Sequence, residues 1–138
     1  MRQHVLDANA LYRFITAGDG ADIVADVFRQ ARADELGTVM MSVVAWGEVC
    51  YTLIRHIGTA RAERALEQAV RLTGLRLIRV EESDARKAAG LKAKFNIPYA
   101  DAFTAALTGN QHVVVTADVD HFRRIPKIRI LQLPHHRS

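Results

Sequence analysis

The chain has 138 residues, of which 49% are hydrophobic and 25% charged, a balance typical of one soluble folded domain. This composition excludes disordered and fibrous proteins. A single cysteine, Cys50, excludes an internal disulfide and favours a reducing, cytoplasmic environment. The net charge of +4 permits a nucleic-acid partner without requiring one. We expect no membrane association, because no stretch has the length and apolarity of a signal peptide or a membrane span.

Short β-branched runs alternate with longer amphipathic segments along the chain, which predicts strands separated by helices. The expected strands are residues 4–6, 38–41, 75–80, 113–116 and 128–131. The expected helices are residues 8–16, 21–34, 43–56, 60–73, 84–95 and 98–108. Ser42, Thr59 and Ser83 are suitable N-caps for the third, fourth and fifth of these helices.

Strands that alternate with helices indicate βαβ units, in which a parallel sheet is covered by helices on both faces. The expected fold is therefore α/β, a three-layer α/β/α sandwich with a mostly parallel sheet of about five strands. No internal repeat or linker is visible, so residues 1–138 are expected to form a single domain, with residues 134–138 as a flexible tail.

Three carboxylates are isolated in uncharged sequence. Asp7, Glu48 and Asp101 are each the only Asp, Glu, Lys or Arg within a stretch of ten or more positions. A buried carboxylate without a partner is unfavourable, so each needs either a basic residue from elsewhere in the fold or a bound cation.

The expected topology brings these acids to one place. Asp7 follows the first strand, and Asp118 and Asp120 follow the fourth, at the sheet edge where open parallel sheets bind ligands. Asp101 lies in the first turn of a helix that begins at that edge, and Glu48 lies almost two turns into another. Oxygen ligands without a cysteine or histidine cluster favour Mg²⁺ or Mn²⁺ over zinc. Two such ions can activate water and stabilise the leaving oxygen in phosphodiester hydrolysis.

Four short segments resemble the PIN-domain family, and more closely its VapC-type ribonuclease toxins. They are residues 5–9, 44–49, 99–102 and 115–120. Each segment alone is unspecific, since a strand that ends in aspartate is common. Their order and spacing together match the family across nearly the whole chain.

This resemblance implies a Mg²⁺- or Mn²⁺-dependent endoribonuclease that is the toxin of a toxin–antitoxin pair. Its acidic core would be Asp7, Glu48 and Asp101, with Asp118 as the fourth acid. Asp7 and Asp101 would bind the metal, and Glu48 and Asp118 would complete its shell directly or through water. The resemblance also implies an RNA substrate, a homodimer, and a small VapB-type antitoxin whose tail occupies the active-site groove.

Several polar positions near these acids have supporting or open assignments. Asn9 and Thr116 match small polar positions that order the site in the family. Either Asp118 or Asp120 can supply the fourth carboxylate. His121 is expected to be a surface or turn residue rather than a ligand. Two arginines follow and either hold the RNA backbone or form an ordinary basic surface; they are Arg123 and Arg124.

Each acid also has a structural interpretation. Asp7 is a suitable N-cap, Glu48 falls on a helical stripe with Thr52 and Arg55, and Asp101 is placed to interact with a helix dipole. An inactive PIN-like scaffold that binds RNA or protein is therefore one alternative. Another is a phosphoryl-handling domain of the receiver or phosphatase type, although such a phosphatase requires a second aspartate where this chain has Asn9.

Overall fold

A computed structural model of the chain describes residues 3–34 and 37–134. All strand pairs in its sheet are parallel, and the strand order is β3-β2-β1-β4-β5. The strands are β1 (Gln3–Leu6), β2 (Val39–Ser42), β3 (Arg76–Ile78), β4 (His112–Thr116) and β5 (Ile130–Gln132). The order reverses between β1 and β4, and the crevice outside the carboxyl ends of such a strand pair is where open α/β sheets bind ligands.

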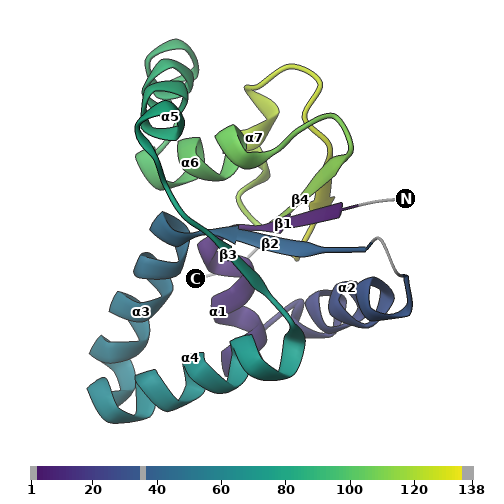
Figure 1. The fold of residues 1–138 in the computed structure, drawn as a ribbon, viewed down its shortest axis with the longest axis vertical. Helices are drawn as coiled ribbons and strands as arrows, with labels where there is room; N and C mark the ends of the chain where they lie inside the picture. The colour runs from purple at the N-terminus through teal and green to yellow at the C-terminus, as the bar shows by residue number, and fades with distance from the viewer. Residues whose placement is uncertain (1–2, 35–36, 135–138) are drawn as a thin grey trace.

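Helices cover both faces of this sheet. In the described part of the chain they are α1 (Ala8–Thr16), α2 (Ala21–Ala33), α3 (Val43–Ile57), α4 (Thr59–Thr73), α5 (Glu82–Phe95), α6 (Tyr99–Leu107) and α7 (Val119–Arg123). Helices α1 to α4 lie on one side of the sheet, and α5 to α7 lie on the other (Figure 1). The predicted three-layer α/β/α fold is confirmed, with a sheet that is entirely parallel.

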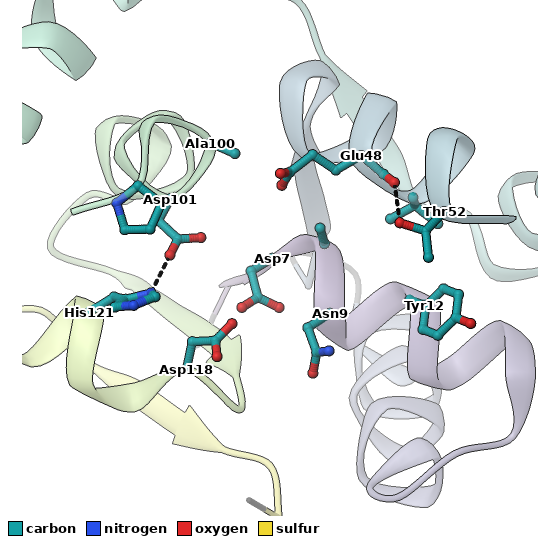
Figure 2. Close-up of a pocket in the computed structure, with 12 residues that line it drawn as sticks. Asp7, Asn9, Tyr12, Glu48, Thr52, Ala100, Asp101, Asp118 and His121 are labelled. Carbon is teal, nitrogen blue, oxygen red and sulfur yellow. Dashed lines mark hydrogen bonds and ion pairs between the residues drawn. The ribbon is translucent and has the colours of Figure 1, made fainter. Parts of the chain in front are cut away.

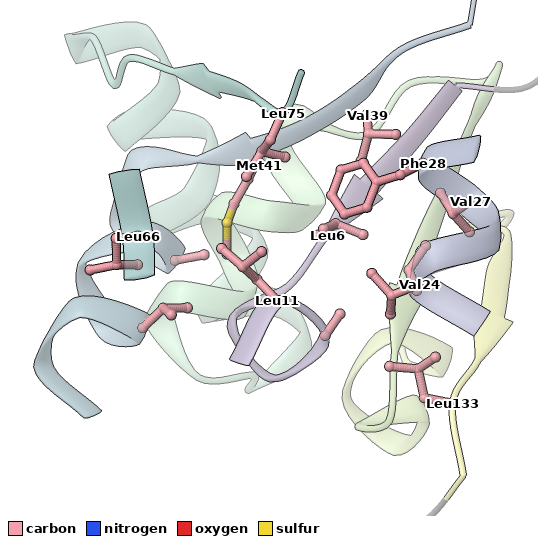
Figure 3. Packing of buried hydrophobic residues seen from close by; sticks show 14 of the residues in the cluster. Leu6, Leu11, Val24, Val27, Phe28, Val39, Met41, Leu66, Leu75 and Leu133 are labelled. Atoms are coloured by element: carbon pink, nitrogen blue, oxygen red, sulfur yellow. The ribbon is translucent and has the colours of Figure 1, made fainter. Parts of the chain in front are cut away.

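The largest hydrophobic core lies between the sheet and the first group of helices. Leu6 and Met41 from the strands pack there with Leu11 and Phe28 from α1 and α2 (Figure 3). Smaller clusters lie under α5 to α7. Strands that are buried on both faces need continuous apolar sequence, which explains the unbroken valines of β4.

The register of the central strands positions the acidic residues. Leu6 of β1 is paired with Val115 of β4, so Asp7 and Thr116, the next residues, emerge side by side at the carboxyl edge. Val5, Leu6, Val114 and Val115 are fully buried, which ties this register to the packing of both faces.

The helix starts differ from expectation at two of the three predicted caps. Ser42 caps α3 as predicted, since its hydroxyl accepts a hydrogen bond from the Val44 N–H at 3.2 Å. Gly58, rather than Thr59, is the N-cap of α4, because the chain turns at its positive φ of 84°. The cap of α5 is Glu81 and not Ser83, because Glu81 and Asp84 form a reciprocal capping box that satisfies two free N–H groups.

The carboxy-terminal part also differs from the prediction. No helix was expected between β4 and β5, but Val119–Arg123 form the short helix α7. Strand β5 begins at Ile130 rather than at residue 128, because Lys127 has a φ of 66° and closes a turn first. Of the predicted tail, Pro134 is held through its carbonyl, which accepts a hydrogen bond from Arg13 Nη1 at 2.6 Å, and residues 135–138 lie outside the described residues.

No described helix has the length and apolarity to cross a membrane.

Candidate active site

Asp7 is the most deeply buried of the acids, with 1% of its surface exposed. It is the N-cap of α1, and its Oδ1 accepts a hydrogen bond from the Ala10 N–H at 2.8 Å. Its Oδ2 accepts a hydrogen bond from the Thr116 hydroxyl. The N-cap interpretation of Asp7 is therefore confirmed, but each carboxylate oxygen can accept more than one contact, so capping leaves the group able to bind a cation.

Thr116 links the acids that follow β1 and β4. Its hydroxyl donates to Asp7 and accepts a hydrogen bond from the Asp118 N–H at 2.8 Å. Thr116 is fully buried, so this bridge is shielded from competing water. The predicted supporting position thus fixes the side chain of one acid and the backbone of another.

Asp101 lies in the first turn of α6 and contacts α7. Its Oδ2 is 2.7 Å from Nδ1 of His121, and the side chain of Asp101 is 15% exposed. The expectation that His121 is merely a surface or turn residue is wrong. Helix α7 buries Val119 and Phe122, and this orientation turns His121 toward Asp101 (Figure 2).

One cleft of about 400 Å³ receives all four predicted acids. Asp7, Asp101 and Asp118 point toward a common space, and Glu48 lies across it on α3 (Figure 2). The other lining residues are Ala8, Asn9, Tyr12, Val49, Thr52, Pro98, Ala100 and His121. Of the residues that the structure describes, no lysine or arginine lines this cleft, and the basic side chain among its lining residues is His121, which contacts Asp101.

The protonation of these acids reflects that environment. The pKa of Asp7 is raised from 3.8 to about 7, chiefly by burial and to a smaller extent by the charges of Asp101 and Asp118, against the lowering effect of the hydrogen bonds from Thr116 and Ala10. Burial and the same two neighbouring carboxylates raise the pKa of Glu48. Burial also raises the pKa of Asp101, against the lowering effect of His121. The cleft therefore favours either bound protons or an added positive charge.

The donor atoms suit a hard divalent cation. They are carboxylate oxygens from four different elements, with a single imidazole already engaged by Asp101, and oxygen donors favour Mg²⁺ or Mn²⁺. Within the described residues, no three acidic, histidine or cysteine side chains stand close enough to hold one ion together as they lie. Direct binding by more than two of these groups would therefore require side chains to turn inward.

The remaining predicted residues divide between this cleft and its surroundings. Asn9 lines the cleft, whereas Asp120 and Arg123 line a separate hollow that shares Asp118 and His121 with it. Arg124 is exposed and donates from Nη1 to the Asn96 carbonyl at 2.6 Å. Of the two candidates for the fourth acid, Asp118 is the one that lines the acidic cleft.

Tyr12 and Thr52 line the cleft but were missed by sequence reasoning. Tyr12 falls three residues after Asn9, and Thr52 falls four residues after Glu48, so both lie on the same helix faces as predicted site residues. Helical spacing from Asn9 could have found Tyr12, and the stripe that joins Glu48 to Thr52 in the sequence already indicated Thr52. The Thr52 hydroxyl donates to the Glu48 carbonyl at 2.9 Å.

Replacing Thr116 with valine should lower the free energy of unfolding by about 1–3 kcal/mol at neutral pH. The variant keeps the side-chain shape but leaves the partly buried Asp118 N–H without its acceptor and the buried Asp7 carboxylate without a donor. It should also raise the pKa of Asp7 further, because that hydrogen bond lowers it. Urea unfolding measures the first effect.

The matched control is Thr104→Val, at another fully buried threonine. The Thr104 hydroxyl only donates to the Ala100 carbonyl within its own helix, at 3.4 Å, so we expect a loss below about 1 kcal/mol. Equal losses in the two variants would contradict the bridging role of Thr116.

This fold and its edge of carboxylates define an α/β domain of the PIN type. The PIN-domain family model matches residues 4–128, and the chain belongs to this family, as its motifs predicted. No curated protein matches the chain significantly.

Solved structures share the fold at low sequence identity. A chain of the VapBC2 complex from Rickettsia felis, bound to a DNA fragment from its promoter, is 14% identical with a TM-score of 0.71, over 96% of this chain and 99% of that one. A chain of DNA-bound VapBC from Salmonella typhimurium is 20% identical with a TM-score of 0.69, over 96% of this chain and 98% of that one. VapC20 from Mycobacterium tuberculosis, a toxin that cleaves the sarcin–ricin loop, is 23% identical with a TM-score of 0.56, over 75% of this chain and 79% of that one.

Proposed function

We propose that this protein is a metal-dependent endoribonuclease and the toxin of a toxin–antitoxin pair. The observation that carries the proposal is the gathering of four carboxylates in one cleft that no described lysine or arginine lines. They are Asp7, Glu48, Asp101 and Asp118. A PIN-domain chain with this donor set is suited to hydrolyse phosphodiester bonds with the help of a divalent cation.

The proposed substrate and partners are inferred from the proteins whose structures this chain resembles. Because VapC20 cleaves the sarcin–ricin loop, an RNA substrate is the natural choice. Because other relatives are VapBC complexes, we propose a VapB-type antitoxin as the partner. A homodimer, with residues 1–138 of each chain acting as one nuclease domain, completes the proposal.

Each of the four acids has a proposed role in metal binding or proton transfer. Asp7 and Asp101 would hold Mg²⁺ or Mn²⁺, with Glu48 and Asp118 completing its shell directly or through water. The bound metal would supply an activated water and stabilise the leaving oxygen. One of the two acids in the outer positions, Glu48 or Asp118, accepts the proton of the attacking water.

Other residues of this chain orient these groups. Thr116 holds the Asp7 carboxylate, and His121 holds the Asp101 carboxylate. Asn9 lines the cleft beside Asp7 (Figure 2). Arg123, in the adjoining hollow next to Asp118, is positioned for a phosphate of the RNA backbone. Arg124 serves the same purpose only if it leaves the Asn96 carbonyl.

The direct test is incubation of the purified protein with structured RNAs in Mg²⁺ or Mn²⁺, with and without a chelator. Cleavage should require the metal. Asp118→Asn should lower kcat/KM by at least about 100-fold, as expected when an electrostatic group leaves an active site. Asp120→Asn, a matched change two residues away and outside the cleft, should leave cleavage nearly unchanged.

Two results would contradict the proposal. Absence of metal-dependent cleavage, with RNA binding retained, would favour the inactive scaffold. Cleavage lost in Asp120→Asn but kept in Asp118→Asn would exchange the roles of these two acids.

A further inference from the structure

The acidic cleft continues into a second hollow. That hollow is about 480 Å³ in volume and shares Asn9, Tyr12 and Asp118 with the cleft. Its other lining residues are Arg13, Thr16, Gly18, Asp19 and Ala117. Both spaces fall in the size range of small-ligand sites. Tyr12 therefore lies at the passage from the four acids into a space that the proposed reaction does not use.

The ring of Tyr12 is held in place by two helices. Tyr12 belongs to α1 and is half-buried against the main hydrophobic core. Its ring centroid is 6.1 Å from that of His56 on α3, at an interplanar angle of 54°. His56 is fixed in turn, because its Nδ1 donates to the Thr52 carbonyl at 2.7 Å. The aromatic surface beside the acids is thus oriented in advance.

The surroundings of this ring are polar. Asn9 Oδ1 is buried and, among the described residues, has no hydrogen-bond partner. Thr16 and Asp19 line the far side of the hollow. An aliphatic side chain placed here would leave the buried Asn9 Oδ1 unsatisfied. A nucleobase offers both a π-face for the ring and hydrogen-bond donors on its edge, and proteins recognise unpaired RNA bases in this way.

We propose that Tyr12 is the stacking platform for the nucleobase next to the scissile phosphodiester. This inference rests on the proposed ribonuclease function and extends it. The bases of a duplex are already stacked on one another, so only a splayed base can lie on Tyr12. His56 is a positioning residue, since it contacts the ring rather than the base.

The test measures RNA binding in the Asp101→Asn background, where cleavage does not interfere. The probes are a short single-stranded oligoadenylate and a strand of the same length with abasic riboses. Tyr12→Phe keeps the ring and should bind oligoadenylate as the parent does. Tyr12→Leu keeps apolar packing without a ring and should bind it about tenfold more weakly, because base–aromatic stacking contributes on that scale.

The abasic strand separates stacking from structural damage. Parent and Tyr12→Leu should bind it equally, since no base is present to stack. Tyr51→Leu is the matched control, because Tyr51 is an exposed tyrosine on α3 that does not line the cleft; it should change neither affinity. Thermal melting verifies that each variant folds.

Equal binding of oligoadenylate by parent and Tyr12→Leu would overturn the platform. An equal loss on both strands would overturn it as well, because the effect would then be structural. RNA cleavage is measured in a separate experiment on protein that retains Asp101. Failure of that cleavage, with the tenfold binding difference present, would overturn the nuclease while supporting base stacking at Tyr12.

Discussion

Replacing Asp7 with asparagine is expected to abolish RNA cleavage and, at the same time, to stabilise the metal-free protein above about pH 7. Cleavage should fall by at least about 100-fold, since a proposed metal-binding charge is removed. Stability should rise because an ionised Asp7 is buried in a cleft that no described lysine or arginine lines, where the one histidine contacts Asp101 instead. Asparagine is equally suited to the N-cap position that Asp7 occupies.

The pH dependence follows from the raised pKa of Asp7. In the unfolded chain the group titrates near 3.8, and in the folded protein near 7. Between these values the folded state binds the extra proton, so stability falls as the pH rises through this window and is level above it. The shift corresponds to a penalty on the order of 4 kcal/mol for ionising Asp7 in the folded protein. In Asp7→Asn, the part of this pH-dependent fall in stability that comes from Asp7 should be absent.

Urea unfolding of metal-free protein across that pH window measures the effect. Asp120→Asn is the control, since Asp120 is exposed and outside the acidic cleft; it should keep the pH profile of the parent. Parallel profiles for Asp7→Asn and the parent would mean that Asp7 is paired or protonated in some other way. The electrostatic basis of the candidate metal site would then be lost.

Magnesium should raise the melting temperature of the parent, and Asp101→Asn should remove that response. At a Mg²⁺ concentration about 100 times its Kd, binding stabilises the folded state by about 2.7 kcal/mol. For a chain of 138 residues, this corresponds to a shift on the order of 10 °C. Thermal melting with Mg²⁺, with Mn²⁺ and with a chelator measures it.

The same variant should change the metal-free protein less than Asp7→Asn does. Both Asp7 and Asp101 have raised pKa values through burial, but Asp101 also has the His121 imidazole at 2.7 Å. Removing the Asp101 charge relieves repulsion and also weakens that contact, so the two effects oppose each other. Asp120→Asn should respond to Mg²⁺ as the parent does. A magnesium response that survives in Asp101→Asn would exclude Asp101 from the site.

Local patterns were sufficient to predict the acids of the central cleft. Asp7, Glu48 and Asp101 stand alone in uncharged sequence, and a carboxylate that folding buries needs compensation. The structure buries Asp7 and partly buries Asp101, whereas Glu48 lies exposed at the cleft. The alternation of valine-rich runs with helical periodicity predicted a parallel sheet, and parallel strands carry such acids to one edge. These inferences depend on neighbouring residues and on general topology, so they could be made without coordinates.

The details around α7 could not be predicted in this way. A helix of five residues is too short to show a clear hydrophobic periodicity, so the sequence did not indicate which side of it faces the core. That orientation places Asp118 and His121 in the cleft and Asp120 outside it. Arg124 is likewise held by a backbone carbonyl 28 positions away, a contact that no local pattern indicates.

The sequence by itself identified the acids that stand alone, because charge and local composition are properties of the residues and their immediate neighbours. Tertiary structure alone decided which groups meet. Thr116 reaches Asp7 across 109 positions because the β1–β4 register places them side by side, and Tyr12 meets His56 because α1 packs on α3. Such contacts depend on how whole elements pack, and packing is settled by the entire core at once.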